Sequence, residues 1–127
     1  GIENHVVHLG PVPDERLPQI YRDADLLVMP SLHEGFGLPV LEAMASGTPV
    51  LAANRGSLPE VVGDAGLLVD DPTDPDALAG AMVRGLGDAK LRRDLRARGL
   101  ARAATFTWER TARETLAVYR EIYEETH

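Results

Sequence analysis

Short apolar runs that alternate with helical patterns are the feature that most constrains the fold of this chain. The second run (DLLVMP) is continuously apolar, which is typical of a strand covered on both faces. An alternation of strands and helices predicts a parallel sheet with helices on both faces. We therefore predict an α/β, Rossmann-like sheet of about four strands, at residues 5–9, 25–30, 49–53 and 66–69.

Polar caps and glycine stops mark the expected helices. Three helices are expected between the strands, and the chain is helical after the fourth strand. The three helices between the strands are expected at residues 15–22, capped by Asp14, at residues 39–46, stopped by Gly47, and at residues 58–62. The later helices are expected to begin after Asp74 or Asp76, near Asp88 and near Thr107. With no repeat or linker, residues 1–127 are expected to form a single partial domain that ends in a C-terminal helix at residues 108–127.

Charge and residue usage exclude several classes of function. The formal net charge of −7 makes nucleic acid and anionic membrane surfaces poor partners. The absence of cysteine excludes disulfides and thiolate metal sites, and the spacing of the four histidines (His5, His8, His33 and His127) predicts no metal site. No apolar run approaches the roughly 18 residues of a membrane span, so we expect a cytoplasmic location. The start at Gly1 favours a piece of a longer protein.

Residues 34–42 (EGFGLPVLE) carry the strongest indication of chemistry. Gly35 and Gly37 allow close approach of a ligand to the backbone, and they lead into a helix N-terminus, which suits phosphate. Glu34 and Glu42 flank this cradle, and carboxylates accept hydrogen bonds from sugar hydroxyls. A ligand that fits this arrangement has hydroxyl groups at one end, a diphosphate in the middle and hydroxyl groups at the other end. A nucleotide-sugar has this order of groups. From the residues alone, Glu42 could equally be an acid favoured by the helix dipole, Glu34 a solvated loop acid, and the glycines turn residues.

A family resemblance separates these alternatives. Residues 30–50 (PSLHEGFGLPVLEAMASGTPV) resemble the signature of the group 1 (family 4) glycosyltransferases, in which seven residues separate two glutamates. Residues 56–69 (GSLPEVVGDAGLLV) and 106–108 (FTW) continue the match. The resemblance implies the GT-B fold, two Rossmann-like domains facing across a cleft. This chain is similar to the latter part of the C-terminal, donor-binding domain.

The resemblance also implies roles for individual residues. Glu34 would hydrogen-bond the donor sugar and stabilise charge at the transferred carbon, which makes it the candidate catalytic residue. Glu42 would hold the ribose hydroxyls, and the turn at Val12 would lie near the base. Backbone amides of the intervening residues would bind sugar and diphosphate: Gly35, Phe36, Gly37 and Leu38. The family transfers sugars with retention and generally needs no metal, so no cofactor is expected.

The chain also departs from the family pattern. It lacks the upstream Arg and Lys that clamp the diphosphate in this family, and it lacks the N-terminal acceptor domain. It also lacks the strands that lie between residues 5–9 and residues 25–30 in the usual Rossmann strand order. The remaining strands must close the gap, pair with another chain or leave the first strand loose. The last helix typically crosses back to the N-terminal domain in this family. Here its apolar face is expected to be exposed or packed on a second copy, so a homodimer could form through the sheet edge or this helix.

The sequence thus predicts the donor-binding segment of a retaining glycosyltransferase. The parent enzyme would move a hexose from a UDP- or GDP-sugar to an acceptor, and the isolated chain is not expected to be active. Two alternatives remain open: a nucleotide or nucleotide-sugar binding module without catalysis, and an inert structural fragment.

Overall fold

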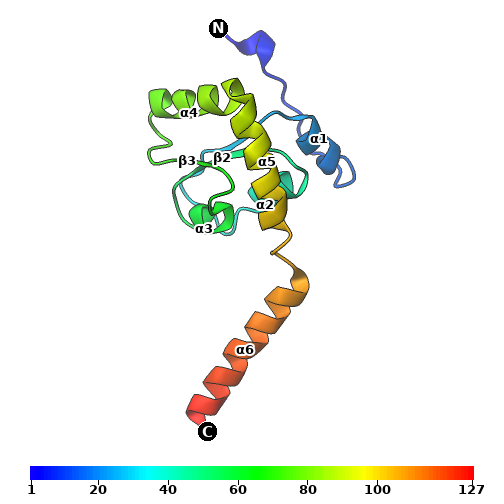
Figure 1. The fold of residues 1–127 in the computed structure, drawn as a ribbon, viewed down its shortest axis with the longest axis vertical. Helices are drawn as coiled ribbons and strands as arrows, with labels where there is room; N and C mark the ends of the chain where they lie inside the picture. Colours follow the sequence, from blue (N-terminus) through cyan, green and yellow to red (C-terminus); the bar gives the residue numbers. More distant parts are fainter.

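The computed structural model describes residues 1–127 and is built around a three-stranded parallel sheet (Figure 1). The strands are β1 (Leu27–Met29), β2 (Val50–Ala53) and β3 (Leu67–Val69), in the order β1-β2-β3. Val28 is in register with Leu51, and Ala52 with Leu68. The α/β class and the parallel sheet predicted from the sequence are therefore confirmed.

Helices cover both faces of this sheet. One face carries a core cluster from α2, β2 and α3, and the other carries a second cluster from β2, β3, α4 and α5. Helix α5 also packs on α2, where Gly99 would place a Cβ 3.4 Å from Met44 Cγ. The helices are α1 (Leu17–Asp23), α2 (Leu38–Ala45), α3 (Leu58–Val62), α4 (Pro75–Gly87), α5 (Ala89–Ala103) and α6 (Trp108–Thr126).

The central strand explains why the sequence shows a continuous apolar run there. All four residues of β2 are buried. Val50 and Ala52 belong to the first core cluster, and Leu51 belongs to the second. A strand that is covered on both faces needs apolar side chains at every position, because neither direction leads to water.

The expected cap at Asp74 and the expected helix starts near Asp88 and Thr107 are confirmed, and all three side chains cap their helices. Asp74 accepts a hydrogen bond from the amide of Asp76 at 2.9 Å, and Asp88 accepts one from Leu91 at 2.9 Å. Thr107 accepts one from the amide of Arg110 at 3.1 Å. These side chains satisfy amides that have no partner within the first turn of a helix.

The expected cap at Asp14 is wrong. Helix α1 begins at Leu17, and its N-cap is Arg16, which forms no side-chain capping bond. A turn precedes the helix, in which the carbonyl of Asp14 accepts a hydrogen bond from the amide of Leu17 at 3.3 Å. The turn delays the helix past the position that the carboxylate of Asp14 could cap.

The predicted strand at residues 5–9 is also wrong, so the sheet has three strands instead of about four. A 3-10 turn, η1 (Glu3–His5), occupies its start, and the following apolar residues do not join the sheet. Val7 is 80% exposed, which is incompatible with a covered strand. The physical reason is the missing partner, because a strand is stabilised by the ladder bonds of a neighbour. Among the three expected outcomes, the structure shows the one in which residues 5–9 are left outside the sheet.

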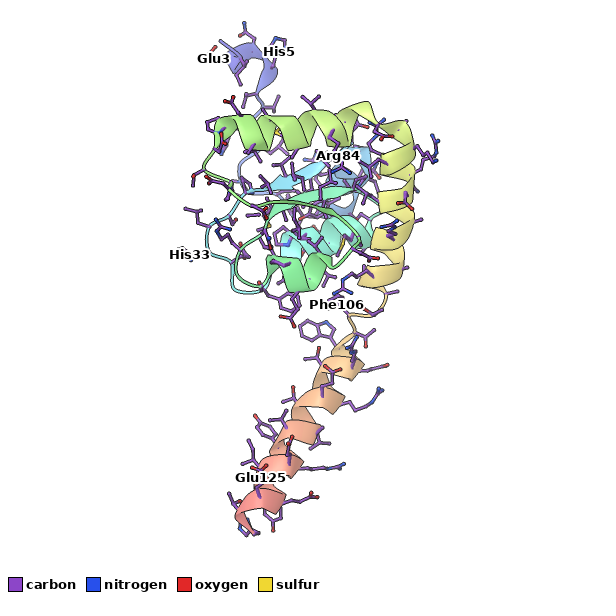
Figure 2. The ribbon with its side chains drawn as sticks, turned by 60° about the vertical axis from the view of Figure 1, so that its left-hand side comes forward. Glu3, His5, His33, Arg84, Phe106 and Glu125 are labelled. Carbon is purple, nitrogen blue, oxygen red and sulfur yellow. The ribbon has the colours of Figure 1, made fainter.

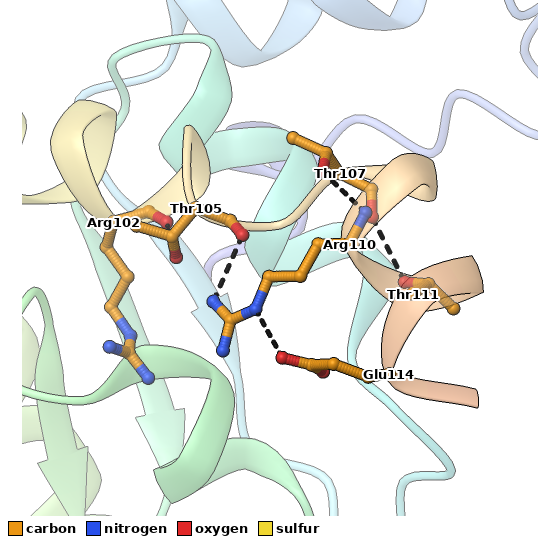
Figure 3. A network of polar contacts seen from close by, with 6 residues as sticks. All are labelled: Arg102, Thr105, Thr107, Arg110, Thr111 and Glu114. Atoms are coloured by element: carbon orange, nitrogen blue, oxygen red, sulfur yellow. Dashed lines mark hydrogen bonds and ion pairs between the residues drawn. The ribbon is translucent and has the colours of Figure 1, made fainter. Parts of the chain in front are cut away.

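Helix α6 projects away from the rest of the molecule (Figures 1 and 2). We call residues 12–106 the body. None of the residues of α6 is buried, and Trp108 is 86% exposed. At the junction (Figure 3), Arg110 of α6 donates to the carbonyl of Thr105, in the segment after α5, at 3.2 Å and to Glu114 within α6 at 2.7 Å. No helix of the chain combines the length and the apolar character that crossing a membrane requires.

Candidate donor-binding site

The loops that follow β1 and β2 meet at the carboxyl edge of the sheet, where parallel folds bind their ligands. Ser57 Oγ donates a hydrogen bond to the backbone carbonyl of Glu34 at 3.2 Å. Gly56 has a φ of 55°, and a Cβ there would lie 3.3 Å from the same carbonyl oxygen. The second loop therefore holds the backbone of Glu34 in place. The half-buried side chain of Glu34 forms no salt bridge within the chain.

Gly37 forms the start of α2 and requires the conformational freedom of glycine. Its φ is 96°, it is the N-cap of the helix, and its carbonyl accepts from the amides of Val40 and Leu41 at 3.1 and 3.2 Å. A Cβ at this position would lie 2.8 Å from Leu58 Cδ2. Packing of α3 under the loop therefore leaves no room for a side chain at residue 37.

The amides of this loop are available to a ligand. Four successive amides donate to no backbone carbonyl: Gly35, Phe36, Gly37 and Leu38. They lie at the N-terminus of α2, where the helix dipole and unpaired donors favour an anion. The sequence-based prediction grouped these four residues, and the structure brings them together in one turn of chain. Their contact with a ligand stays a prediction.

Glu42 lies on α2 and its carboxylate has one partner within the chain. The hydroxyl of Tyr21, on α1, donates a hydrogen bond to Glu42 Oε2 at 2.8 Å. Burial raises the pKa of Tyr21 to about 12, and the hydrogen bond to Glu42 and the charge of Glu42 act in the same direction. Tyr21 was not identified from the sequence, because no local pattern pairs residues that are 21 positions apart.

A cavity of about 400 Å³ opens beside this pair. Its lining includes Asp14 and Leu17 from the turn before and the start of α1, and Glu42 from α2. The half-buried Val12 lies two residues before Asp14 and does not line the cavity. The structure thus brings the end of the Val12 turn to Glu42, whereas contact between Val12 and a base stays a prediction.

The side chain of Phe36 faces the junction with α6 rather than the interior. Its ring meets that of Phe106 edge-to-face, with centroids 6.1 Å apart and an interplanar angle of 82°. Arg102 lies 5.6 Å from the centroid of Phe106 and donates from Nε to the carbonyl of Val61 at 2.7 Å. Figure 2 shows Phe106 where the body meets α6. This aromatic contact anchors the glycine loop from its outer side, and the sequence-based prediction did not include it.

Histidine and acidic residues do not gather in this structure. No group of three or more histidine, aspartate and glutamate side chains is arranged to hold a metal ion. His33, next to Glu34, is exposed on the loop after β1 (Figure 2).

Comparisons with known proteins identify the family of this chain. Residues 1–102 match the protein family described as "Glycosyl transferases group 1". The chain is 50% identical over 118 residues to the O-antigen chain mannosyltransferase B of Escherichia coli, covering 93% of this chain and 31% of that protein. It is 46% identical over 129 residues to the D-inositol 3-phosphate glycosyltransferase of Nocardia farcinica, covering 100% of this chain and 28% of that protein.

Solved structures share the fold. The chain superposes on the sucrose-phosphate synthase of Thermosynechococcus elongatus with a TM-score of 0.84 and 37% identity, over 98% of this chain and 32% of that one. It is also similar to the C-terminal domain of a group 1 glycosyl transferase from Francisella tularensis, with a TM-score of 0.66 and 34% identity, over 79% of this chain and 51% of that one. The chain spans less than a third of the length of the curated relatives described above.

Proposed function

This chain belongs to the group 1 glycosyltransferases, and we propose that it forms the donor-binding segment of an enzyme that transfers a hexose, with retention, from a UDP- or GDP-sugar to an acceptor. The observation that carries the proposal is the row of four free amides at the start of α2, with Glu34 before it and Glu42 after it. Free amides at a helix N-terminus suit a diphosphate, and the carboxylates suit hydroxyls.

Each residue takes the part of the donor that its chemistry fits. The amides of residues 35–38 bind the diphosphate and the sugar. Ser57 holds the backbone of Glu34. The carboxylate of Glu34 accepts hydrogen bonds from the hydroxyls of the sugar and stabilises positive charge at the transferred carbon. Glu42 accepts hydrogen bonds from the ribose hydroxyls, and the turn at Val12 lies near the base. Transfer is proposed to need no metal, with the free amides at the start of α2 facing the charge of the diphosphate.

The isolated chain is proposed to bind the donor without turnover. The curated relatives are about three times as long, so most of their length lies outside the matched region. We propose that this further part supplies an acceptor-binding domain and basic groups for the diphosphate. The same free amides and flanking carboxylates would also serve the second candidate, a nucleotide-sugar binding module without catalysis. The two differ in one respect: addition of the upstream domains would restore transfer only in the first.

Calorimetric titration of the 127-residue chain with UDP, GDP, UDP-glucose and GDP-mannose tests the proposal. Binding of one nucleotide family would support a formed donor site and identify the base. Glu42→Ala is expected to weaken that binding by about 1–3 kcal/mol. Glu125→Ala, on the exposed end of α6, is the matched control and should leave the affinity unchanged. An equal loss in both variants, or none in Glu42→Ala, would return Glu42 to the role of an ordinary helix acid.

The partner of α6 is tested in the same samples. We propose that its apolar residues are covered either by the upstream domain of the longer protein or by a second copy of this chain. Tyr119, Ile122 and Tyr123 are each more than half exposed in the single chain. Sedimentation of the chain at rising concentration gives the mass of a dimer in the second case and of a monomer in the first.

A further inference from the structure

Tyr21 is the one side chain that hydrogen-bonds the carboxylate of a glutamate in the proposed donor site, and it comes from a different helix. Its hydroxyl donates to Glu42 Oε2 at 2.8 Å, across the contact between α1 and α2. Phenylalanine would fill the same apolar contact with the core, where the ring of Tyr21 packs against the first cluster. The presence of a hydroxyl at residue 21 is therefore explained by its hydrogen bond to Glu42 and not by packing.

The backbone of Tyr21 is fixed independently of that hydrogen bond. Thr48 is buried between α2 and β2, and its hydroxyl donates to the carbonyl of Tyr21 at the end of α1. The backbone of Tyr21 is thus held by Thr48, and its ring packs against the first core cluster. An anchored phenol has few rotamers, so it can impose an orientation on an exposed carboxylate that would otherwise rotate freely.

The cavity beside the pair has the chemistry of a hydroxyl-binding site. Its lining includes two carboxylates, Asp14 and Glu42, and no basic side chain. Such a lining disfavours phosphate and accepts hydrogen bonds from hydroxyl groups. Because Tyr21 occupies Oε2, the remaining acceptor capacity of Glu42 lies mainly on Oε1.

We infer that Tyr21 is a positioning residue for ribose recognition: its hydroxyl turns the carboxylate of Glu42 so that this carboxylate accepts hydrogen bonds from the ribose hydroxyls of the donor nucleotide. The inference rests on the proposed function. To the proposed function, the inference adds a residue outside the glutamate and glycine motif. It also gives a physical reason why Glu42 recognises the ribose in one orientation.

The test compares each nucleotide with an analogue that lacks the ribose hydroxyls. The unaltered chain, Tyr21→Phe and the control Tyr119→Phe, which removes an exposed hydroxyl on α6, are titrated with UDP, GDP and their 2′,3′-dideoxy forms. Tyr21→Phe is expected to reduce the preference for the ribose form by about fivefold to tenfold, with the affinity for the dideoxy form unchanged. Tyr119→Phe should change neither affinity. In a Glu42→Gln background, Tyr21→Phe should have no further effect on the preference.

The outcomes separate the two claims. If the unaltered chain binds neither nucleotide, the proposed function of the chain fails, and this inference fails with it. If the chain binds a nucleotide and Tyr21→Phe keeps the full preference for ribose, the proposed function stands and the inference alone is overturned. An equal loss of affinity for the ribose and dideoxy forms would also overturn it, because that pattern indicates a general loss of structure.

Ultraviolet titration provides a second test that needs no ligand and no variant at residue 21. The chain has three tyrosines, so replacement of Tyr119 and Tyr123 by Phe leaves Tyr21 as the only titrating phenol. Its pKa should be about 12 in that chain and should fall when Glu42→Gln removes the charge. The same pKa with and without the charge of Glu42 would show that the contact is absent in solution and would overturn the inference.

Discussion

The body of the molecule and its last helix are both helical where their sequences predict helix, yet they are stabilised in different ways. In the body, α2 and α3 bury Val40 and Leu58 completely in the first core cluster. In α6, the predicted apolar face exists but covers nothing: Leu116 is 47% and Tyr119 is 66% exposed. Capping and helix propensity are enough to define α6, whereas the arrangement of the body depends on tertiary burial.

Every proposed ligand contact lies in the body. Glu34 is held through its backbone by Ser57, and Glu42 through its side chain by Tyr21. Both contacts join different elements of the packed core. Loss of buried side chains in the body should therefore alter stability and binding together, whereas changes on the exposed surface of α6 should alter neither.

The largest expected effect comes from removing a buried side chain of the body. Leu58→Ala should lower the free energy of unfolding by about 2–5 kcal/mol, because it leaves a cavity under Gly37 and in the core. Leu116→Ala makes the same chemical change on α6 and should cost less than about 0.5 kcal/mol. Urea unfolding measures both, and similar losses in the two variants would mean that α6 is packed in solution.

An intermediate effect is expected at the glycine that starts α2. Gly37→Ala should destabilise the chain by about 1–3 kcal/mol, because residue 37 has a φ of 96° and its Cβ would lie 2.8 Å from Leu58 Cδ2. Gly80→Ala is the matched control in α4, where a Cβ meets nothing within 4 Å. It should stabilise the chain by about 0.5–1 kcal/mol. Thermal unfolding should therefore shift in opposite directions, and a shared direction would contradict the assigned backbone of residue 37.

The smallest effect on global stability is expected at the cap of α6. Thr107→Ala removes the side-chain oxygen that accepts from the amide of Arg110, which weakens the helix by about 0.5–2 kcal/mol. Hydrogen exchange of the amides of α6 should accelerate, while the urea midpoint of the body stays the same. Asp88→Ala, which removes the cap of the packed helix α5, should instead lower the midpoint. A lowered midpoint in Thr107→Ala would show that α6 and the body unfold as one unit.

Much of this architecture could be predicted from the sequence because its causes are local. The caps at Asp74, Asp88 and Thr107 and the helix stop at Gly47 depend on residues a few positions away. The strands at residues 27–29, 50–53 and 67–69 are apparent from continuous apolar runs. The family, and with it the grouping of Glu34, the glycine loop and Glu42, could be recognised from residues 30–50 alone.

Only the tertiary structure decided the rest. The apolar residues 6–9 have the pattern of a strand, but they remain unpaired because no neighbouring strand offers them hydrogen bonds. The contacts of Tyr21 with Glu42 and of Phe36 with Phe106 join positions that local periodicity does not relate. Such contacts depend on how helices cross and pack, which the spacing of residues along one helix does not determine. The sequence by itself therefore determined the elements and the family, and packing determined which side chains meet.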